Sequence, residues 1–590
     1  MSQDNKKDMS QYFFRASAAD FMKIPGGPIA YWVDDTILES FSFPPVSSVA
    51  KTRVGCQTSD NNRFLRLWHE VSHCRSKFDS VSKEEAENSE FKWFPYNKGG
   101  SYRKWFGNQE YVINWENAGQ EVFSFAKSLY GSPTRTVKNG AFYFRSSVTW
   151  SKISSGIPSF RWQPAGSIFD VAGASVFLDS KVDEFALLAQ LNSSIVLEQL
   201  KILSPTLNYE TSQISSLPAV FNLSDKEVVC EKVERLVSNS KIDWNMYEFS
   251  WGFLNHPLLL MKDCDLKEAY NQLRKKKISL LEEQSNLERD VNCLVAKSFG
   301  VDEHYSQDSG TISLFANLAY RYDNPSAHAR EQSDTLAELL SYSIGCIMGR
   351  YSLDCEGLVY AHAGNQGFTD LVNQGAYQTL PADEDGILPL TDLEWFPDDA
   401  TNRFREFVST VWGEENLQQN LDFVAESLCL YAIKPKRGES AMDTIRRYLS
   451  TQFYKDHLKT YKKRPIYWLF SSGKQKAFEC LVYLHRYNEG TLARMRTEYV
   501  IPLTAKLATY VDKLEQDKDA SSSAAETKRL EKEIAALHKQ QVELASFDEK
   551  LRHYADMRIS LDLDDGVKVN YGKFGDLLAN VKDVTGEKPQ

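Results

Sequence analysis

The stretch LKEAYNQLRKKKISLLEEQSNLERDVNCL, residues 266–294, divides the chain into two parts of different character. Leucine recurs in it every seven residues, at Leu266, Leu273, Leu280, Leu287 and Leu294. Because the residues between these leucines are mostly charged, the stretch predicts a long amphipathic helix, and its period is also that of a coiled-coil seam. Two interpretations stay open: a helix that buries an ordinary core, and an arm between two functional parts.

A second pattern of the same kind lies near the C-terminus. The apolar residues of this pattern are Leu530, Ile534, Leu537, Leu544 and Leu551. They follow a stretch rich in Asp, Ser and Ala, residues 517–526, which suits a bend, and Leu503, Leu507 and Leu514 precede it. The sequence therefore predicts two C-terminal helices, antiparallel to one another.

On the N-terminal side of residue 225, the pattern is that of short strands joined by loops. Apolar and aromatic runs alternate with Gly, Pro, Asn and Ser. The runs are AYWV (30–33), FKWFPY (91–96), AFYFRSSVTW (141–150) and SIFDVAGASVF (167–177). A helix is expected over 184–203 and a closing strand over 215–221, whereas 300–500 is mostly helical by pattern.

The predicted fold class is α+β: a mixed α/β domain, then a long-helix spacer, then a mostly helical C-terminal region. We expect six segments in chain order. They are a tail (1–20), a mixed domain (21–225), a linker with the heptad helix (226–300), a helical domain with a basic patch (301–500), antiparallel coiled-coil helices (501–555) and a second tail (556–590).

Charge is distributed unevenly along the 590 residues. The whole chain has a net charge of −11, which by itself argues against a nucleic-acid binder, because phosphate affinity comes from Lys and Arg. Residues 91–165, however, carry ten basic and three acidic side chains, and residues 434–476 carry twelve and three. Local charges of +7 and +9 restore nucleic acid as a candidate ligand. Aromatic residues accompany the first segment, and we expect Trp93, Tyr96, Trp105 and Trp150 to pack in the core rather than stack on bases.

The composition is that of a globular protein, with 42% hydrophobic and 25% charged residues. Nine scattered cysteines without a CxxC pair indicate a reducing compartment rather than a disulfide framework or a zinc ribbon. The sequence has neither an apolar signal core near its N-terminus nor a run long enough for a membrane span. We expect a cytoplasmic protein that does not bind membranes.

One five-residue motif could hold a metal. HEVSH (69–73) matches H-E-x-x-H, in which two histidines on one helix face bind zinc and the glutamate acts as general base. So short a motif also arises by chance, and its flanks are basic, so a zinc enzyme built on His69 and His73 is only a remote alternative. No phosphate loop, GxGxxG loop after a strand, or GxSxG elbow occurs in the sequence, which therefore predicts no catalytic residue and no metal site.

Several longer strings resemble one family closely. They are KIPGGPIAYWV (23–33), AKTRVGCQTSDNNRFLRLW (50–68), KWFPYNKGG (92–100), YRKWFGN (102–108), TWSKISSG (149–156), IFDVAGASVF (168–177), SPTLNYETSQISSLP (204–218) and RPIYWLFSSGKQKAFECLVYLHRYN (464–488). The family is PglX, the adenine-specific DNA methyltransferases of BREX phage-defence systems. The resemblance covers nearly the whole chain, and strings of this length are far more specific than HEVSH.

The chain resembles only the C-terminal half of that family, its target-recognition and helical regions. The cofactor-binding domain, with its Asn-Pro-Pro-Tyr motif, has no counterpart in this sequence. The resemblance therefore implies sequence-specific recognition of double-stranded DNA without catalysis in this chain. It implies S-adenosylmethionine only for the absent domain, and no cofactor here. It also implies, as partners, a separate methyltransferase domain, other BREX proteins or phage inhibitors that mimic DNA.

Candidate DNA contacts follow from the basic segments and the quoted strings. Basic side chains supply contacts to phosphate or guanine, and neutral ones supply hydrogen bonds to base edges. The basic candidates of the recognition domain are Arg53, Arg63, Lys92, Lys98, Arg103, Lys104, Arg145 and Lys152. The neutral candidates are Thr58, Asn61, Asn97, Thr149 and Ser151. Lys462, Lys463 and Arg464 belong to the 434–476 patch, which is expected to clamp flanking DNA.

By analogy with specificity subunits of other restriction–modification systems, 266–294 and 530–551 are expected to pair as an antiparallel spacer. The leading hypothesis is a DNA-recognition module without catalysis. The alternative is an interaction scaffold of the defence complex, whose basic patches meet acidic protein partners.

Overall fold

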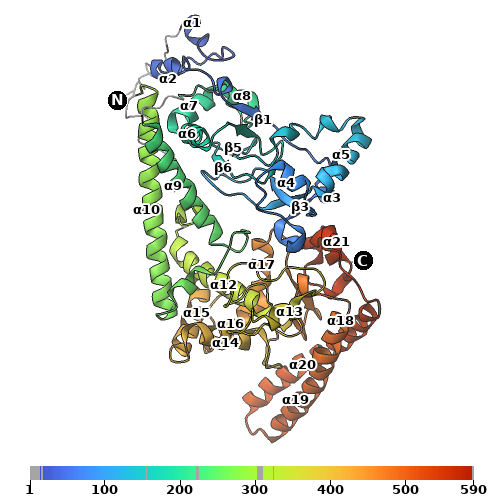
Figure 1. Ribbon diagram of the computed structural model, residues 1–590. Helices are drawn as coiled ribbons and strands as arrows, with labels where there is room; N and C mark the ends of the chain where they lie inside the picture. Colours follow the sequence, from blue (N-terminus) through green and yellow to red (C-terminus); the bar gives the residue numbers. More distant parts are fainter. Residues whose placement is uncertain are drawn as a thin grey trace, which may run out of the picture. The chain divides into compact units, whose positions relative to one another are not determined.

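A computed structural model describes residue 14 and residues 17–154, 156–220, 225–301, 310–322 and 325–587. Helices make up 53% and strands 9% of the structure, so the predicted combination of α and β elements is confirmed. Figure 1 follows the chain from blue at the N-terminus to red at the C-terminus.

The chain folds into two compact units, each assembled from separate stretches of sequence. The first unit consists of Met1–Leu65, Lys77–Trp244 and Lys277–Arg321. The second unit consists of Arg66–Ser76, Asn245–Lys276 and Tyr322–Gln590. The chain therefore passes repeatedly from one unit to the other.

Short strand pairings, antiparallel except for β3 with β7, build the sheets of the first unit. One sheet has the order β1-β8-β5-β6, and three strands of another, β4, β3 and β7, lie wholly in this unit. The strands are β1 (Lys51–Arg53), β3 (Trp93–Asn97), β4 (Tyr111–Asn114), β5 (Ser147–Trp150), β6 (Phe160–Gln163), β7 (Ile168–Phe169) and β8 (Ser175–Phe177). The aromatic runs at 91–96, 141–150 and 167–177 thus contain strands, as predicted. Trp93, Tyr96, Trp105 and Trp150 are at most 2% exposed, which confirms that they are core residues.

Most helices of the first unit follow a polar N-cap residue. They are α1 (Ala18–Phe21), α2 (Asp35–Ser40), α3 (Asn61–Phe64), α4 (Lys83–Glu87), α5 (Glu116–Tyr130), α6 (Lys181–Leu191), α7 (Ser194–Leu203), α8 (Thr211–Ser216), α9 (Lys226–Asn245) and α11 (Leu318–Arg321). The helix expected over 184–203 is divided in two. Between the two helices, the Asn192 side chain accepts from the Phe160 N–H and donates to the Phe160 carbonyl, at 3.0 Å each. Ser193 then caps α7.

Two predicted strands of the first unit are wrong. Residues 30–33 form a turn, in which Tyr31 and Trp32 are about half exposed. Over 215–220 the chain makes one isolated bridge, Pro218 with Pro45, and Phe221 lies outside the described residues. Prolines cannot donate to a strand ladder, which explains the second difference.

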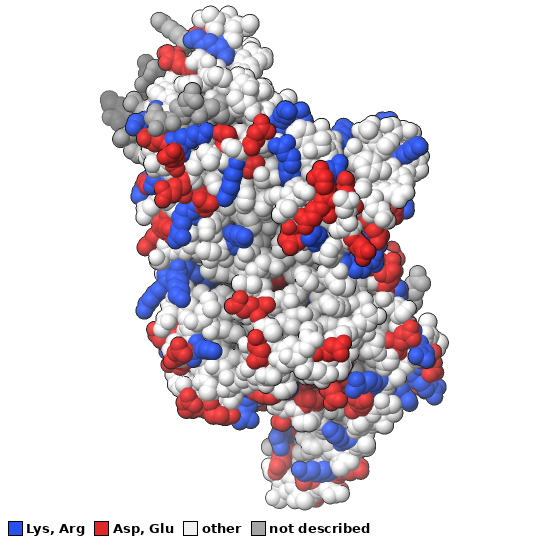
Figure 2. All heavy atoms as spheres, in the orientation of Figure 1, with Lys and Arg blue, Asp and Glu red and all other residues white. Residues whose placement is uncertain are grey.

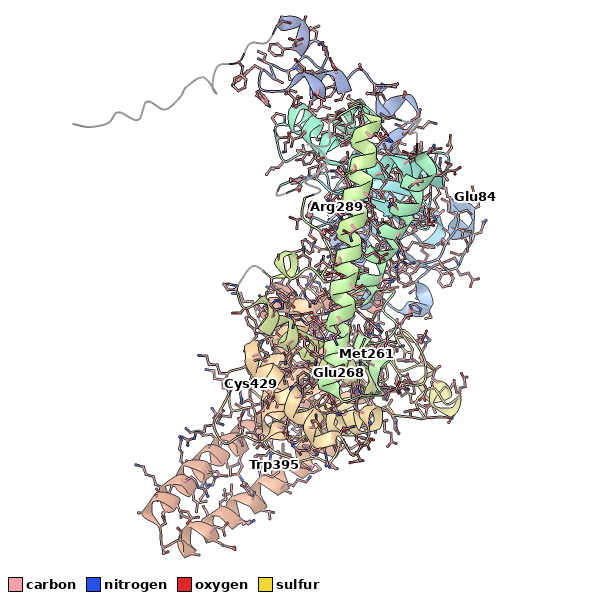
Figure 3. The ribbon with its side chains drawn as sticks, turned by 90° about the vertical axis from the view of Figure 1, so that its left-hand side faces the viewer. Glu84, Met261, Glu268, Arg289, Trp395 and Cys429 are labelled. Atoms are coloured by element: carbon pink, nitrogen blue, oxygen red, sulfur yellow. The ribbon has the colours of Figure 1, made fainter. Side chains whose placement is uncertain are left out.

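The heptad stretch forms one continuous helix, α10 (Leu266–Ser298), whose axis is clear in Figure 3, where it carries Glu268 and Arg289. Its leucine seam is buried only at the start: Leu266 and Leu273 are at most 3% exposed, whereas Leu280, Leu287 and Leu294 are half-buried. Further along, the buried face shifts to polar side chains such as Gln284 and Glu288. The period of seven therefore marks the helix but not a continuous apolar seam.

The partner of α10 in the first unit is α9, which runs antiparallel to it. Lys232 pairs with Asp290 at 2.8 Å and Arg235 with Glu283 at 2.6 Å. The predicted pairing of 266–294 with 530–551 is therefore replaced by a different arrangement, because each of these helices packs on a neighbour close to it in sequence.

The second unit is mostly helical around one small sheet of order β10-β11-β9. Its strands are β9 (Ile387–Pro389), β10 (Tyr467–Ser471) and β11 (Glu479–Tyr483). Its helices are α12 (Ala327–Ile347), α13 (Phe368–Asn373), α14 (Ala400–Trp412), α15 (Leu417–Tyr431), α16 (Ala441–Tyr448), α17 (Tyr454–Thr460), α18 (Thr491–Arg494), α19 (Ile501–Ala520), α20 (Ala524–Asp556), α21 (Gly566–Gly572) and α22 (Val581–Thr585). One apolar core joins these elements.

Helices α19 and α20 form an antiparallel hairpin, as Figure 1 shows in red. The Tyr510 hydroxyl bonds Glu533 at 3.1 Å, and Arg496 pairs with Asp548 at 2.7 Å. The predicted apolar residues of both helices are buried between them or in the core. Before α19 the backbone widens to a π-helical turn, because Pro502 has no N–H to offer the carbonyl four residues earlier.

In the described part of the chain, no helix combines the length and the apolar character that a bilayer crossing requires. All nine cysteines are free thiols.

Candidate nucleic-acid interface

A buried polar network fixes the loop NKGG, residues 97–100, at the end of β3. The Asn97 amide donates to the Thr149 hydroxyl at 2.6 Å, and the Ser151 hydroxyl both accepts from the Gly100 N–H and donates to its carbonyl, at 2.9 and 2.8 Å. Gly99 has a φ of +80°, and a Cβ there would lie 2.8 Å from the Ala172 carbonyl oxygen. Three sequence candidates, Asn97, Thr149 and Ser151, are thus brought together, but they bond the backbone of this junction.

Two lysines leave this junction toward the surface. The Lys98 ammonium lies 4.9 Å from the Tyr111 ring centre, and Lys152 forms an ion pair with Glu210 at 2.8 Å. Burial raises the pKa of the nearby Asp170, and the charge of Lys98 opposes that rise. Both lysines keep the half-buried positions that a phosphate contact from a rigid loop requires.

Arg103 and Lys104 lie in the interior of the first unit and not at the surface positions expected of DNA contacts. They are 2% and 1% exposed. Lys104 pairs with Glu288 at 3.0 Å, and Arg103 lies 3.8 Å from Asp243. Trp105 also donates to Glu288, at 2.8 Å. The string YRKWFGN therefore ties a loop of the first unit to helices α9 and α10.

A third buried cation in this region was missed by sequence reasoning. Arg161 of β6 is 1% exposed and donates to the Arg103 carbonyl at 3.4 Å. Burial, followed by the neighbouring charge of Arg103, lowers the pKa of Arg161 to about 10. A basic residue within a strand of alternating aromatics is the signal that could have indicated an inward-facing charge.

Arg145 lines an open groove of about 640 Å³ in the first unit. Its side chain is 44% exposed and lies 3.6 Å from the fully exposed Asp179. Lys83 and Lys181 line the same groove, together with Glu84, which is labelled in Figure 3. Because an ion pair between exposed groups contributes little, the Arg145 guanidinium can exchange Asp179 for a phosphate or a guanine edge.

The other candidates of the recognition region lie at the surface or just beneath it. Arg63 is exposed but pairs with Glu121 at 2.8 Å, and Thr58, 1% exposed, donates to Asn61 at 2.7 Å. Arg53 lies over the ring of Phe142 at 5.2 Å. Lys92 lies 5.6 Å from the Trp93 ring. Thr58 is too deeply buried to reach a base, whereas Arg53, Asn61, Arg63 and Lys92 stay predictions.

In the second unit, exposed lysines follow one side of α17. Lys455 and Lys459 are one turn apart on the helix, and Lys462 and Lys463 continue the row into the following turn. We call these four residues the α17 ridge. Lys455 and Lys459 have no carboxylate within 4 Å among the described residues. Arg464, 29% exposed, instead donates to the Val584 carbonyl at 3.1 Å. Lys455 and Lys459 extend the predicted site. They were counted in the charge of 434–476 but were not named as candidate DNA contacts.

Much of the remaining 434–476 charge is neutralised locally. Arg446 pairs with the buried Asp399 at 2.5 Å, Arg447 with Glu439 at 2.7 Å and Lys476 with Glu479 at 2.8 Å. On the face seen in Figure 2, basic and acidic side chains are interspersed rather than gathered. The effective basic surface of this segment is therefore smaller than its net charge of +9.

HEVSH does not have the geometry of a zinc helix. His69 and His73 belong to two separate 3₁₀ turns with extended residues between them. The His69 ring nitrogen Nε2 lies 3.2 Å from the Arg464 carbonyl, and the Glu70 carboxylate accepts from the N–H groups of Leu67 and Val567, at 2.9 Å each. Across the described ranges, no group of three His, Cys, Asp or Glu side chains could hold a metal ion. The motif is a structural segment of the second unit.

Known proteins match almost the whole chain. No protein-family model matches it. The adenine-specific methyltransferase BrxX of Escherichia coli O9:H4 (strain HS) is 49% identical over 578 residues, 97% of this chain and 46% of that protein. The adenine-specific methyltransferase PglX of Lacticaseibacillus casei (strain Zhang) is 36% identical over 575 residues, 95% of this chain and 45% of that protein. The chain spans about half the length of the curated relatives it matches. Over about 95% of its length, this chain is homologous to the adenine-specific methyltransferases BrxX and PglX.

Proposed function

We propose that this chain is the double-stranded-DNA recognition part of a BREX-type adenine-specific DNA methyltransferase. The observation that carries the proposal is the junction around NKGG, where a fully bonded polar network holds Lys98 and Lys152 at the surface. A rigid base below projecting cations is what phosphate contacts need in order to fix a protein in one register on DNA. The homology to two adenine-specific methyltransferases agrees with this assignment.

In this proposal, three sets of cations have different roles in DNA binding. Lys98 and Lys152 position the first unit on the phosphate backbone, and Arg145 in its groove contacts a phosphate or a guanine. The α17 ridge adds affinity that depends on salt and not on sequence. Sequence is read by loops of the first unit.

In the described part of the chain, one glycine-containing segment can be compared with an S-adenosylmethionine site, and it does not fit. The glycine-containing segment AGNQG (363–367) precedes α13, a helix of six residues, and no strand leads into it. A methyl-donor site needs a strand, a glycine loop and a helix in succession. We therefore derive no methyl-transfer step within this chain and propose that the cofactor binds to a methyltransferase domain that completes the enzyme.

Fluorescence anisotropy with a library of short duplexes tests the proposal. Measurements at 50 and 200 mM salt, with and without S-adenosylmethionine, should give a preference for some duplexes and a steep loss of affinity at the higher salt. Arg145→Ala should weaken binding to the preferred duplex more than binding to the others. Uniform affinity for all duplexes would contradict sequence recognition.

A second candidate function, a protein-interaction scaffold, is favoured by one surface. Met22, Ile29, Tyr31 and Trp32 are 50–79% exposed, and Tyr31 and Trp32 are of the residue types that dominate protein interfaces. The same segment has few basic side chains. It therefore suits a protein partner, such as another BREX protein, better than DNA, and pull-down with purified BREX proteins would test it.

A further inference from the structure

Two loops of the first unit pair to form a small projection. The Tyr209 N–H donates to the Lys152 carbonyl at 2.7 Å, and the Ser154 N–H donates to the Leu207 carbonyl at 3.0 Å. Ile153 lies opposite Asn208 in an isolated antiparallel bridge. We call residues 152–154, 156–158 and 205–209 the finger.

The base of the finger is fixed by two aromatic side chains. Trp150, which is completely buried, donates its indole N–H to the Tyr209 carbonyl at 2.9 Å. Tyr209 is 7% exposed, and its hydroxyl donates to the Gly156 carbonyl at 3.2 Å. The Ser204 hydroxyl donates to the Asn208 carbonyl at 2.9 Å. These hydrogen bonds fix the described residues at the base of the finger.

The outer surface of the finger is aliphatic. Ile153 is 74% exposed, Leu207 53% and Ile157 46%. Ile153 lies opposite Asn208, so the adjacent Leu207 is on the other face of the paired loops. Burying side chains of this size stabilises a complex, so exposed aliphatic side chains on both faces of the finger indicate that it contacts a ligand on both sides.

The surroundings of the finger are those of a phosphate-binding surface. Lys152 belongs to the finger itself, and its N–H donates to the Ala172 carbonyl at 2.9 Å. Gly99 approaches the same carbonyl, which places the neighbouring Lys98 beside the base of the finger. No carboxylate lies within 4 Å of the Lys98 ammonium among the described residues. Lys152 pairs with Glu210 at 2.8 Å, and because this pair is partly exposed, a phosphate can replace the carboxylate. The charges of the two lysines therefore favour DNA as the occupant.

Backbone hydrogen bonds within the finger leave it few groups with which to read base edges. What the tip can recognise in a duplex is apolar: the face of a base at an opened step, or the methyl group of thymine. Resting on the DNA binding proposed above, we infer that Ile153, Ile157 and Leu207 contact apolar base surfaces directly. Lys98 and Lys152 hold the flanking phosphates while they do so.

Two substitutions and a matched control test this inference. Ile153→Ser and Leu207→Ser remove apolar surface that is already exposed in the free protein, so neither should lower its melting temperature. Each should weaken binding of the preferred duplex about tenfold and leave the salt dependence unchanged. Leu129→Ser, at a leucine of the same unit that is 51% exposed, should change affinity less than twofold.

Modified duplexes distinguish the two kinds of base surface. If the tip opens a base step, 2-aminopurine in the preferred duplex should brighten with the unaltered chain and not with Leu207→Ser. If it contacts a thymine methyl, deoxyuridine at one position should weaken the unaltered chain about tenfold and leave Leu207→Ser unaffected. The inference is overturned if both serine variants bind as tightly as the unaltered chain. Failure of the proposed function would differ, because the unaltered chain would then not bind duplex at all.

Discussion

Two consecutive lysines, Lys462 and Lys463, have φ angles of +50° and +60°. Side chains other than Gly, Asn and Asp rarely adopt this left-handed conformation, which costs about 1 kcal/mol or more at each residue. The turn is held by hydrogen bonds from the N–H groups of Lys463 and Arg464 to the end of α17. Long cationic side chains at such positions suit a role for the charge, because glycine would be the more stable choice.

We predict opposite effects from the same substitution at two neighbouring lysines. Lys463→Gly should raise the free energy of unfolding in urea by about 1 kcal/mol, since it relieves the left-handed strain. Lys459→Gly, inside α17, should lower it by about 1 kcal/mol through the poor helix propensity of glycine. Both should weaken DNA binding. A loss of stability in Lys463→Gly would contradict the assignment of strain.

A buried carboxyl makes the stability of the second unit depend on pH. Burial, reinforced by the nearby Asp383, raises the pKa of Asp385 to about 8, and the Tyr499 hydroxyl lies 3.0 Å from it. The folded protein therefore holds this proton more tightly than the unfolded chain, in which the pKa is near 3.8. The stabilisation is complete below about pH 4 and is lost as pH rises to about 8.

Asp385→Asn should remove that dependence. Between pH 5 and 8, the melting temperature of the unaltered chain should fall relative to that of the variant, and the difference is the measurement. Asp79→Asn, at an exposed surface carboxylate, is the control and should follow the unaltered chain. Parallel curves for Asp385→Asn and the unaltered chain would show that Asp385 titrates normally.

At the scale of elements, buried ion pairs join a loop to α9 and α10 within the first unit. Glu288 accepts from both Lys104 and Trp105, at 3.0 and 2.8 Å. Asp243 accepts from the N–H groups of Phe315 and Ala316, at 2.7 and 2.9 Å. Because these groups are almost completely buried, losing one partner leaves the other charged and unsolvated.

Glu288→Ala should therefore lower the free energy of unfolding by about 3 kcal/mol or more. Glu283→Ala is the matched control on the same helix: its pair with Arg235 is exposed, and the change should cost about 0.5 kcal/mol. Chemical denaturation of the three proteins measures the difference. Equal costs would indicate that Glu288 is better solvated than its 1% side-chain exposure implies.

The sequence predicted elements best where an apolar pattern decides them locally. Strands β3 and β5, helix α10 and the α19–α20 hairpin all follow from such patterns. The sequence did not predict that α9 is the partner of α10, because a heptad pattern shows which face of a helix is apolar and not which helix covers that face. The strand expected over 30–33 failed because glycines and prolines on its N-terminal side turn the chain.

The candidate site was predictable to a similar degree. Cations at or near the surface, such as Lys98, Arg145 and Lys463, were found by counting charge. The same count could not separate Arg103 and Lys104 from them, because their partners Asp243 and Glu288 lie more than a hundred residues away in sequence. The finger could not be predicted, because a sequence does not distinguish an exposed isoleucine from a buried one.

At the scale of the whole molecule, a net charge of −11 coexists with a DNA-binding proposal. Many basic side chains of the two basic segments are paired with carboxylates, so the attraction that overcomes general repulsion of DNA must come from the remaining ones. The slope of log affinity against log salt should then be proportional to the number of phosphates that these side chains neutralise.

Neutralising two residues of the α17 ridge tests how many phosphate contacts the protein makes. The double variant Lys455→Gln, Lys459→Gln should reduce the slope of log affinity against log salt by about 2, and should do so for every duplex. Arg496→Gln, which removes a cation already paired with Asp548, should leave the slope unchanged. An unchanged slope in the double variant would exclude the α17 ridge from the interface.

The segment Arg66–Ser76 belongs to the second unit, although the chain on both sides of it belongs to the first. Its Glu70 carboxylate accepts from the N–H of Val567, 497 residues later. A ribosome makes Glu70 first and this partner 497 residues later. While the residues between Glu70 and Val567 are being made, the second unit must therefore lack part of the site that binds residues 66–76. Cutting the chain at any single point would separate that peptide from its site or divide a unit.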